Sequence, residues 1–305
     1  MPGPTTSHQR YAASSTGCTK TPEWVYGINR NGCTKTPGAL TAGPTHHTIY
    51  ATQLVDIDRH VLLDVVRDRS AASVTTWLSS RTRYFRDHVE VAAIDPHAGY
   101  FKALRTSLPR ATVTVDVFHA VKLANAAVDD VRRRVQRETL GHRGRNDDPL
   151  YGIRRLLTRA YERLSDKQLA RVEEALRIGD LYDEVGGAWA VKEQLRCVYD
   201  ADNLAVATVR LEQFYELAHT AATPEVLRLA KTIKRWEPQV LSFFTTGRTN
   251  ARSEAMNLIT EKLRRNAHGI RNFENYRLRL LLHSGVQWHT RPTARIRGRH
   301  PRLIA

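Results

Sequence analysis

Two aspartates in this chain of 305 residues each lie where a predicted β-strand ends. Asp95 follows the apolar run 89–94, and Asp116 closes the β-branched run 111–117. Carboxylates at strand ends supply the oxygen ligands that Mg²⁺ prefers, and two such ions can hold the attacking and leaving oxygens of a phosphodiester. The two acids therefore suggest metal-dependent phosphoryl transfer.

Each of these acids also has a structural interpretation, and both interpretations stay open. Asp95 precedes Pro96 and fits a simple turn equally well. Asp116 fits the N-cap of a helix that begins near His119, which is the favoured interpretation from the local sequence. His119 fits either a structural role, the commoner one for histidine, or a role in orienting a carboxylate or contacting substrate.

A third acid, Glu254, lies in the first turn of a helix predicted over 253–265. A helix dipole favours an acid there without any catalytic role. The neighbouring bases favour a site instead, because they would hold a nucleic-acid backbone beside the carboxylate. These bases are Arg248, Arg252, Arg264 and Arg265.

The elements that would position these acids follow from residue patterning. Two β-branched runs, 49–55 and 61–66, read as a hairpin, and short helices are predicted over 71–79 and 97–106. Strands alternating with helices predict an α/β sheet. From residue 118 the pattern becomes helical, with apolar residues three and four apart along 121–135 and again along 153–164. Trp189, Leu195, Phe214 and Leu217 are predicted core residues of this helical stretch.

Residues 1–45 are rich in Gly, Pro, Ser and Thr and predict mostly irregular structure. The hexapeptide GCTKTP occurs twice, at 17–22 and 32–37, which is far short of a solenoid repeat. The strand-like stretch within this segment is 23–28, with Glu23 at its edge. No Asp or Glu occurs from residue 24 to residue 55.

The formal net charge of +16 predicts a polyanionic partner, with nucleic acid first. From residue 248 onward there are 13 Lys+Arg and 3 Asp+Glu, so this end carries +10 of that charge. The arginine-rich segment after residue 286 lacks the apolar face of a membrane-binding helix, and no apolar run approaches the length of a bilayer span. With three cysteines and no apolar secretory segment, we expect a cytoplasmic protein that does not bind membranes.

Five stretches together resemble insertion-sequence DDE transposases of the ISL-three type. Their order and spacing over about three quarters of the chain are more specific than any one of them. They are 47–56 (HTIYATQLVD), 94–100 (IDPHAGY), 115–119 (VDVFH), 249–257 (TNARSEAMN) and 269–279 (GIRNFENYRLR).

The resemblance implies a ribonuclease-H-like mixed sheet interrupted by a large all-helical insertion. We therefore expect an irregular segment at 1–45, a sheet portion at 46–120, a helical insertion at 121–245, closing helices at 246–285 and a basic tail at 286–305.

The same resemblance implies site residues and ligands. Asp95 would be the second metal-binding carboxylate, with Asp116 as its rival, and Glu254 would be the last. Two Mg²⁺ ions would activate water, and then a DNA 3′-hydroxyl, for attack on phosphodiesters. Transposon ends and target DNA are the expected partners, together with self-association. The expected DNA-binding residues are Arg248, Arg252, Arg264, Arg265, Arg271 and Arg277.

The sequence departs from the family at its start. Members carry the first catalytic Asp on the first strand, just before the segment that matches 47–56, and this chain has no acid there. The family's zinc-binding and helix-turn-helix modules also have no counterpart in the sequence. A frameshift, truncation or gene fusion within the first 45 residues would explain both. We therefore expect impaired catalysis; the alternative is a non-catalytic, DNA-binding remnant or regulator.

Overall fold

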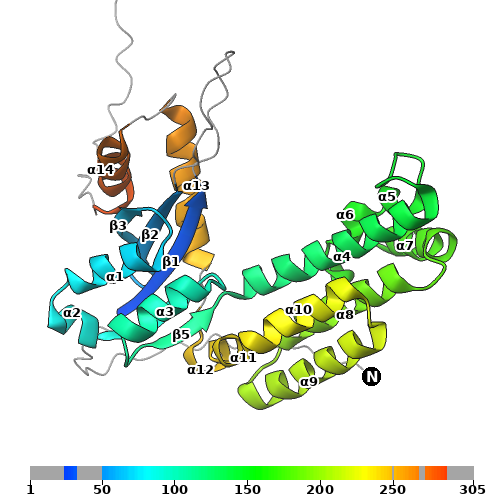
Figure 1. Ribbon diagram of the computed structural model, residues 1–305, viewed down its shortest axis with the longest axis horizontal. Coiled ribbons are helices and arrows are strands. Elements are labelled where there is room, and N and C mark those ends of the chain that lie inside the picture. Colours follow the sequence, from blue (N-terminus) through cyan, green and yellow to red (C-terminus); the bar gives the residue numbers. More distant parts are fainter. Residues whose placement is uncertain (1–23, 33–49, 249–250, 268–271, 287–305) are drawn as a thin grey trace, which may run out of the picture.

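The computed structural model describes residues 24–32, 50–248, 251–267 and 272–286. For residues 24–32, 117 and 251–254 it describes the backbone alone. Figure 1 shows two parts, a sheet flanked by helices and a long helical arm that projects from one edge of the sheet. The chain is thus a mixed α/β protein that is mostly helical, as the sequence predicts.

Five strands form one mixed sheet in the order β3-β2-β1-β4-β5. The neighbours β1/β2 and β2/β3 are antiparallel, whereas β1/β4 and β4/β5 are parallel. The strands are β1 (Trp24–Gly32), β2 (Tyr50–Asp56), β3 (Val61–Arg67), β4 (Val89–Ile94) and β5 (Thr112–Val115).

Strand β1 is the central strand of this sheet. The sequence predicts mostly irregular structure through residue 45 with one strand-like stretch at 23–28, and the structure has a longer strand there, Trp24–Gly32. The glycines and asparagines of this stretch weaken its local β signal, whereas β2 and β4 supply backbone partners along both of its edges. Pairing with distant strands, rather than local propensity, therefore accounts for β1.

The predicted hairpin is confirmed as β2 and β3, and its turn is held by the acid that ends β2. Asp56 is 2% exposed, and its Oδ1 accepts hydrogen bonds from the backbone N–H groups of Asp58 at 3.0 Å and Arg59 at 2.9 Å. His60 completes the turn in a left-handed conformation, with φ of 57°. Asp56 is thus a structural residue of the turn.

Helices cover both faces of the sheet. The first face packs against α1 (Ala71–Ser79), α2 (Arg83–Asp87) and α3 (Ala98–Ser107) around buried residues such as Leu54, Ile94 and Leu104. The second packs against α13 (Ala251–Asn266) and α14 (Phe273–Ser284), where Met256 and Tyr276 join a cluster with the hairpin. Although α13 and α14 follow the whole helical arm in the sequence, they pack against the hairpin strands that precede it (Figure 1).

The helical arm has its own continuous core. Leu195 and Phe214 are fully buried in it, and Trp189 and Leu217 pack against it partly buried, as predicted. Its helices are α4 (Val117–Leu140), α5 (Pro149–Gly152), α6 (Arg154–Leu157), the 3₁₀ turn η1 (Tyr161–Arg163), α7 (Asp166–Gly179), α8 (Glu184–Tyr199), α9 (Leu204–Ala221), α10 (Pro224–Arg235), α11 (Glu237–Leu241) and α12 (Phe243–Thr246). None of the described helices is both long enough and apolar enough to cross a membrane.

The periodic stretch 153–164 is not one helix, contrary to the sequence prediction. Lys192 of α8 is fully buried, and its Nζ donates to the carbonyl oxygens of Leu157 and Arg159, both at 2.7 Å. Those carbonyls consequently do not accept hydrogen bonds from a continuing helix. The ammonium group thus ends α6 and fixes it to the arm.

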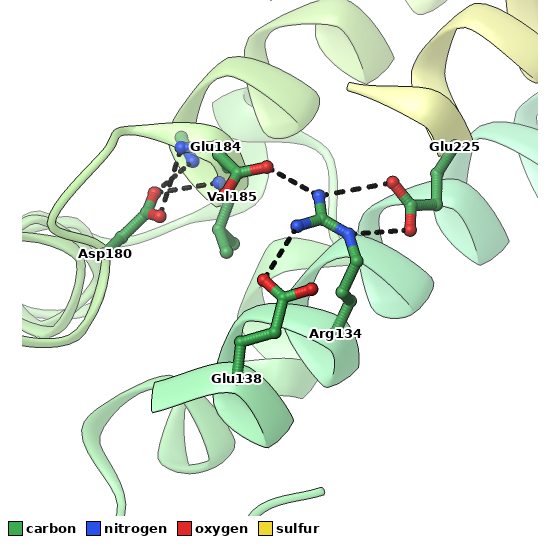
Figure 2. Close-up of polar contacts among 7 residues, drawn as sticks. Arg134, Glu138, Asp180, Glu184, Val185 and Glu225 are labelled. Atoms are coloured by element: carbon green, nitrogen blue, oxygen red, sulfur yellow. Dashed lines mark hydrogen bonds and ion pairs between the residues drawn. The ribbon is translucent and has the colours of Figure 1, made fainter. Parts of the chain in front are cut away.

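One arginine joins three helices of the arm, as Figure 2 shows. Arg134 of α4 bonds Glu184 at the start of α8 and Glu225 at the start of α10, with its Nε 2.9 Å from Glu225 Oε1. Its remaining nitrogen reaches Glu138 one turn further along α4 at 3.1 Å. Beside this network, Asp180 accepts N–H groups from the first turn of α8, with Val185 at 2.8 Å. Ion pairing to helix N-termini therefore sets how α8 and α10 pack on α4.

Candidate functional site

Asp95 and Asp116 lie at the carboxyl ends of neighbouring parallel strands. Ile94 pairs with Val115 in the β4/β5 register, and each acid is the next residue along. The backbone N–H of Asp116 donates to the carbonyl of Ile94 at 3.3 Å, which continues the ladder to this point. The two side chains are 3% and 2% exposed. The sheet thus brings the two predicted acids together in a nearly buried position.

His119, in the first turn of α4, stands between these carboxylates. Its Nε2 lies 3.3 Å from Asp95 Oδ1, and its Nδ1 lies 3.3 Å from Asp116 Oδ2. A neutral imidazole donates through one nitrogen only, whereas a protonated ring donates through both. Both contacts are hydrogen bonds when the ring is protonated or when one of the two carboxyl groups carries the proton, and the ring then fixes the direction of both carboxyl groups. The orienting role considered for His119 is consistent with this geometry.

Asp116 occupies the N-cap position of α4, as the local sequence predicts. Within the described part of the chain, however, its side chain makes no capping hydrogen bond to that helix. The carboxylate is directed to His119 instead. Asp116 is therefore the N-cap residue by backbone position, while its side chain contacts His119 rather than the start of the helix.

Tyr199, which the sequence did not indicate, lies close enough to Asp116 for the charge of that carboxylate to affect its pKa. Burial, followed by the charge of Asp116, raises the pKa of Tyr199 above its ordinary value. Tyr199 ends α8 and packs against the cores of both the arm and the sheet. Among the described residues its hydroxyl has no hydrogen-bond partner. Tyr199 comes near Asp116 only through packing between distant segments, so the sequence spacing does not indicate it.

Glu254 lies on α13, the helix that crosses the opposite face of the sheet and packs against β1. Its backbone is described and its side chain is not. Two contacts fix the helix: Met256 is buried in the hairpin cluster, and Thr260 Oγ1 accepts a 2.7 Å hydrogen bond from Gln53 Nε2 of β2. The approach of the Glu254 carboxylate to the two aspartates remains a prediction.

The register between β1 and β4 places a further residue of β1 at this edge of the sheet. Ile28 of β1 pairs with Ile94 of β4 in parallel register. Asn29 is the next residue, so it is level with Asp95 along the sheet, and it pairs with Gln53 on the other side. Sequence reasoning missed Asn29 because the register between β1 and β4 is not visible from spacing. Glu23, at the edge of the predicted strand, lies outside the described residues.

The predicted DNA-binding arginines have different surroundings. Arg248 pairs with Asp58 in the hairpin turn, and Arg264 and Arg265 both pair with Glu261 on α13. Arg265 is 75% exposed, so its guanidinium remains accessible. The side chain of Arg252 and all of Arg271 lie outside the described residues. DNA contact by these five residues remains a prediction.

Arg277, the sixth, belongs to a polar network beneath α14. Its Nε donates to Asp64 Oδ1 of β3 at 2.6 Å, and Trp77 Nε1 of α1 donates to Asp64 Oδ2 at 2.8 Å. Burial raises the pKa of Asp64, but the hydrogen bonds from Arg277, Trp77 and the Val65 N–H outweigh it and hold that pKa below its ordinary value. The network explains Arg277 as a structural residue, and its contact with DNA remains a prediction.

The donor set suits a hard divalent cation, although only in part. Asp95 and Asp116 offer carboxylate oxygens, which Mg²⁺ and Mn²⁺ prefer. The part of the chain with described side chains contains no group of three or more His, Cys, Asp or Glu residues arranged to hold a metal ion. The two aspartates alone do not complete a cation site, and further ligands would have to come from Glu254, from DNA or from water.

Comparison with protein families defines the class of protein. A family model for DDE enzymes of the ISL-three type, described as a transposase, matches residues 41–280. The chain belongs to this transposase family, so DNA transposition is its general function and DNA is its substrate. No curated protein matches the chain. Strand β1 precedes the matched region.

Proposed function

We propose that this chain is the catalytic domain of a DNA transposase that uses a divalent metal for DNA cleavage and strand transfer, and that this activity is impaired. The observation that carries the proposal is the pair Asp95 and Asp116 at adjacent strand ends, each with an oxygen 3.3 Å from one nitrogen of His119. Two nearly buried carboxylates at adjacent strand ends are oxygen donors of the kind that a hard divalent cation binds. Transposon ends and target DNA are its two substrates.

The sheet supports a ribonuclease-H-like assignment. Its order is β3-β2-β1-β4-β5, and β2 is the one strand of the five that runs against the others. In sheets of this kind the crevice beyond the carboxyl ends of the parallel strands is the usual place for a ligand. Asp95 and Asp116 lie at that edge.

The residues present would hold one cation between the two strand ends. Asp95 and Asp116 would be its carboxylate ligands, and Glu254 would approach from α13. When bound, the cation would supply Lewis-acid activation of water, and then of a DNA 3′-hydroxyl, for attack on a phosphodiester. His119 would keep one oxygen of each aspartate in place, because an outer partner that orients a ligand carboxylate limits its motion.

The proposed impairment of catalysis rests on Asn29, the neutral residue of β1 that lies level with Asp95. A two-metal site needs enough negative charge to hold both ions close together. Asn29, the β1 residue level with Asp95, is neutral, so β1 adds no negative charge at this position of the sheet. We infer that one cation is held and that the second is held poorly.

The experiment is metal binding and cleavage by the full chain. Mn²⁺ titration by calorimetry should detect a site that Asp95→Ala and Asp116→Ala each weaken. A duplex carrying the ends of the chain's own element, incubated with Mg²⁺ or Mn²⁺, should be cut slowly by the wild type. Glu254→Ala should abolish that cutting and leave salt-sensitive DNA binding unchanged. Rapid strand transfer by the wild type would contradict impairment.

The second candidate is a DNA-binding remnant without catalysis. The neutral Asn29 favours it, as does the lack of a three-ligand cluster among the described side chains. This candidate predicts no cutting by the wild type, and Mn²⁺ binding that is indifferent to Asp95→Ala. The calorimetric titration therefore separates the two functions even when no cleavage is detected.

A further inference from the structure

Four arginines gather at the end of the arm that lies farthest from the sheet. The loop 141–148 joins α4 to α5 there (Figure 1), and the backbone of its Gly144 lies against the ring of Tyr151. The Arg154 guanidinium lies over the same ring, 3.8 Å from its centre, and Arg171 of α7 donates to the carbonyl of Gly152 at 3.2 Å. Arg143 and Arg145 flank Gly144 in the loop. We call Arg143, Arg145, Arg154 and Arg171 the tip patch.

The loop of the tip patch is held in one shape by its own acid. Asp148 Oδ2 accepts the backbone N–H of Arg145 and the amide of Gln136 on α4, the latter at 3.4 Å, and it lies 3.5 Å from His142 Nδ1. Gly144 has φ of 113°, and a Cβ atom there would lie 2.7 Å from the Tyr151 ring. Only glycine therefore allows this close approach, and the loop presents its arginines from a fixed backbone.

Positive charge remains uncompensated at the tip patch. Arg143 and Arg145 are exposed, and neither forms an ion pair with the acids of the described residues. Arg132 and Arg133, by contrast, both pair with Asp129 on α4. The three consecutive arginines at 132–134 are therefore compensated by acids before the loop begins.

The excess of positive charge is confined to the tip of the arm and is not a property of the whole arm. Residues 121–245 contain 21 Lys+Arg against 19 Asp+Glu, whereas residues 141–171 contain 8 against 4. Two of these four acids are engaged, Asp148 within the loop and Glu162 with Arg196. Asp147 remains exposed beside the arginines, so a clear positive balance is left.

Helix α4 links the tip patch to the candidate site and sets their separation. Asp116 is its N-cap and Gly141 its C-cap, with 24 residues between them. At 1.5 Å per residue the helix is about 36 Å long. One turn of B-DNA also spans about 34–36 Å, or about ten base pairs. Both ends of α4 can therefore face the same side of one duplex.

We propose that the tip patch binds the phosphate backbone of DNA about ten base pairs from the phosphodiester that lies at Asp95 and Asp116. Guanidinium groups pair with phosphate oxygens in a geometry that does not depend on base sequence. The contact therefore positions the duplex along the arm and reads no sequence. It rests on the proposed function for the location of the scissile bond.

The test is the salt dependence of DNA binding by the full chain. For Arg143→Ala/Arg145→Ala, the slope of log K against log salt concentration on a 30-base-pair duplex should fall by about 1.8, since each lost phosphate contact removes about 0.9. Arg177→Ala/Arg210→Ala is the matched control, because it removes two arginine charges from the same arm outside the patch. Its slope should equal that of the wild type.

A hydroxyl-radical footprint places the contact. The wild type should protect two windows about ten base pairs apart, and Arg143→Ala/Arg145→Ala should lose one of them. Arg143→Gln/Arg145→Gln, which keeps a polar side chain with hydrogen-bond donors and removes the charge, should behave as the alanine variant does. An unchanged slope and footprint in a variant that melts like the wild type would overturn the proposal.

Two other outcomes also overturn it. A change of oligomeric state with an unchanged slope would show that the arginines bind an acidic surface of a second copy. Loss of both windows in the double variant would show that the patch does not act separately from the site. Cleavage and Mn²⁺ binding are measured independently, so failure of the tip patch leaves the proposed function standing.

Discussion

Arg277 of α14 and Asp64 of β3, 213 residues apart in the chain, form a 2.6 Å ion pair beneath the last described helix. Asp64 is 6% exposed and also accepts the indole N–H of Trp77 from α1. The edge strand, the first helix and the last helix are thus joined at one carboxylate. This pair is a fixed part of the fold and supports the helices on both faces of the sheet.

Removing the arginine should destabilise the sheet domain. Arg277→Met leaves Asp64 charged, nearly buried and short of two hydrogen bonds, which should lower the free energy of unfolding by about 2 kcal/mol. Thermal or urea unfolding followed by circular dichroism measures the change. Arg279→Met on the same helix removes an exposed charge and should cost less than about 0.5 kcal/mol. Equal losses in the two variants would contradict the role of the pair.

The same pair gives stability a defined pH dependence. Hydrogen bonding holds the pKa of Asp64 below its unfolded value of 3.8, despite the opposing effect of burial. A carboxyl group whose folded pKa is depressed contributes stability above the unfolded pKa and loses it as pH falls through the folded pKa. We expect stability to fall below about pH 4 and this fall to be smaller in Arg277→Met. Unfolding midpoints measured from pH 3 to 7 test the sign.

His119→Ala should weaken metal binding without unfolding the protein. The ring lies 3.3 Å from an oxygen of each aspartate, so its loss frees both carboxylates to move. Outer partners of this kind typically change metal affinity by about 10–100-fold. Mn²⁺ calorimetry gives the affinity, and thermal melting checks the fold. His119→Asn should recover part of the affinity through one remaining hydrogen bond, and an affinity unchanged by either variant would exclude the orienting role.

Asn29→Asp should strengthen metal binding and cleavage. The substitution returns one negative charge to the β1 position level with Asp95, and affinity for a hard cation rises with the number of charged ligands. We expect Mn²⁺ affinity to rise by about tenfold and Mg²⁺-dependent DNA cutting to increase. Asn31→Asp is the matched control, because it makes the same change two residues further along β1, opposite Ala51. Equal gains from both variants would indicate a non-specific effect of charge.

Arg134→Met should loosen the arm. It removes the bonds that tie α4 to Glu184 and Glu225, and Glu225 is 8% exposed. Burial raises the pKa of Glu225, but hydrogen bonding from Arg134 outweighs it and lowers that pKa. We expect a loss of about 2–3 kcal/mol in unfolding free energy. Arg177→Met, which breaks an exposed pair with Glu174, should leave the unfolding free energy essentially unchanged.

Much of the fold could be predicted from the sequence because its signals are local. The hairpin, helix α1 and the capping box at the start of α7, formed by Ser165 and Gln168, all depend on residues a few positions apart. The break after α12 likewise follows from Gly247, which ends the helix with φ of 63°. Where one segment decides its own structure, the sequence prediction is confirmed.

The remainder depends on contacts between distant segments. The extension of β1 beyond residue 28 depends on its pairing with β2 and β4, and the place of Asn29 depends on the register that this pairing sets. The break in the helix at 153–164 results from Lys192, more than thirty residues later. Asp95 and Asp116 could be proposed from the sequence as neighbours because both end strands, whereas the contact of His119 with both required the structure.

The hydrogen bond between Gln53 and Thr260 spans 207 residues, and it bears on how the chain folds during synthesis. The apolar core of the arm comes from the continuous segment 120–233, so the arm can fold as soon as it leaves the ribosome. The second face of the sheet stays uncovered until α13 and α14 have been made. Its exposed hairpin surface must therefore be kept from aggregating over the time needed to translate about two hundred residues, roughly ten to forty seconds at about 5–20 residues per second.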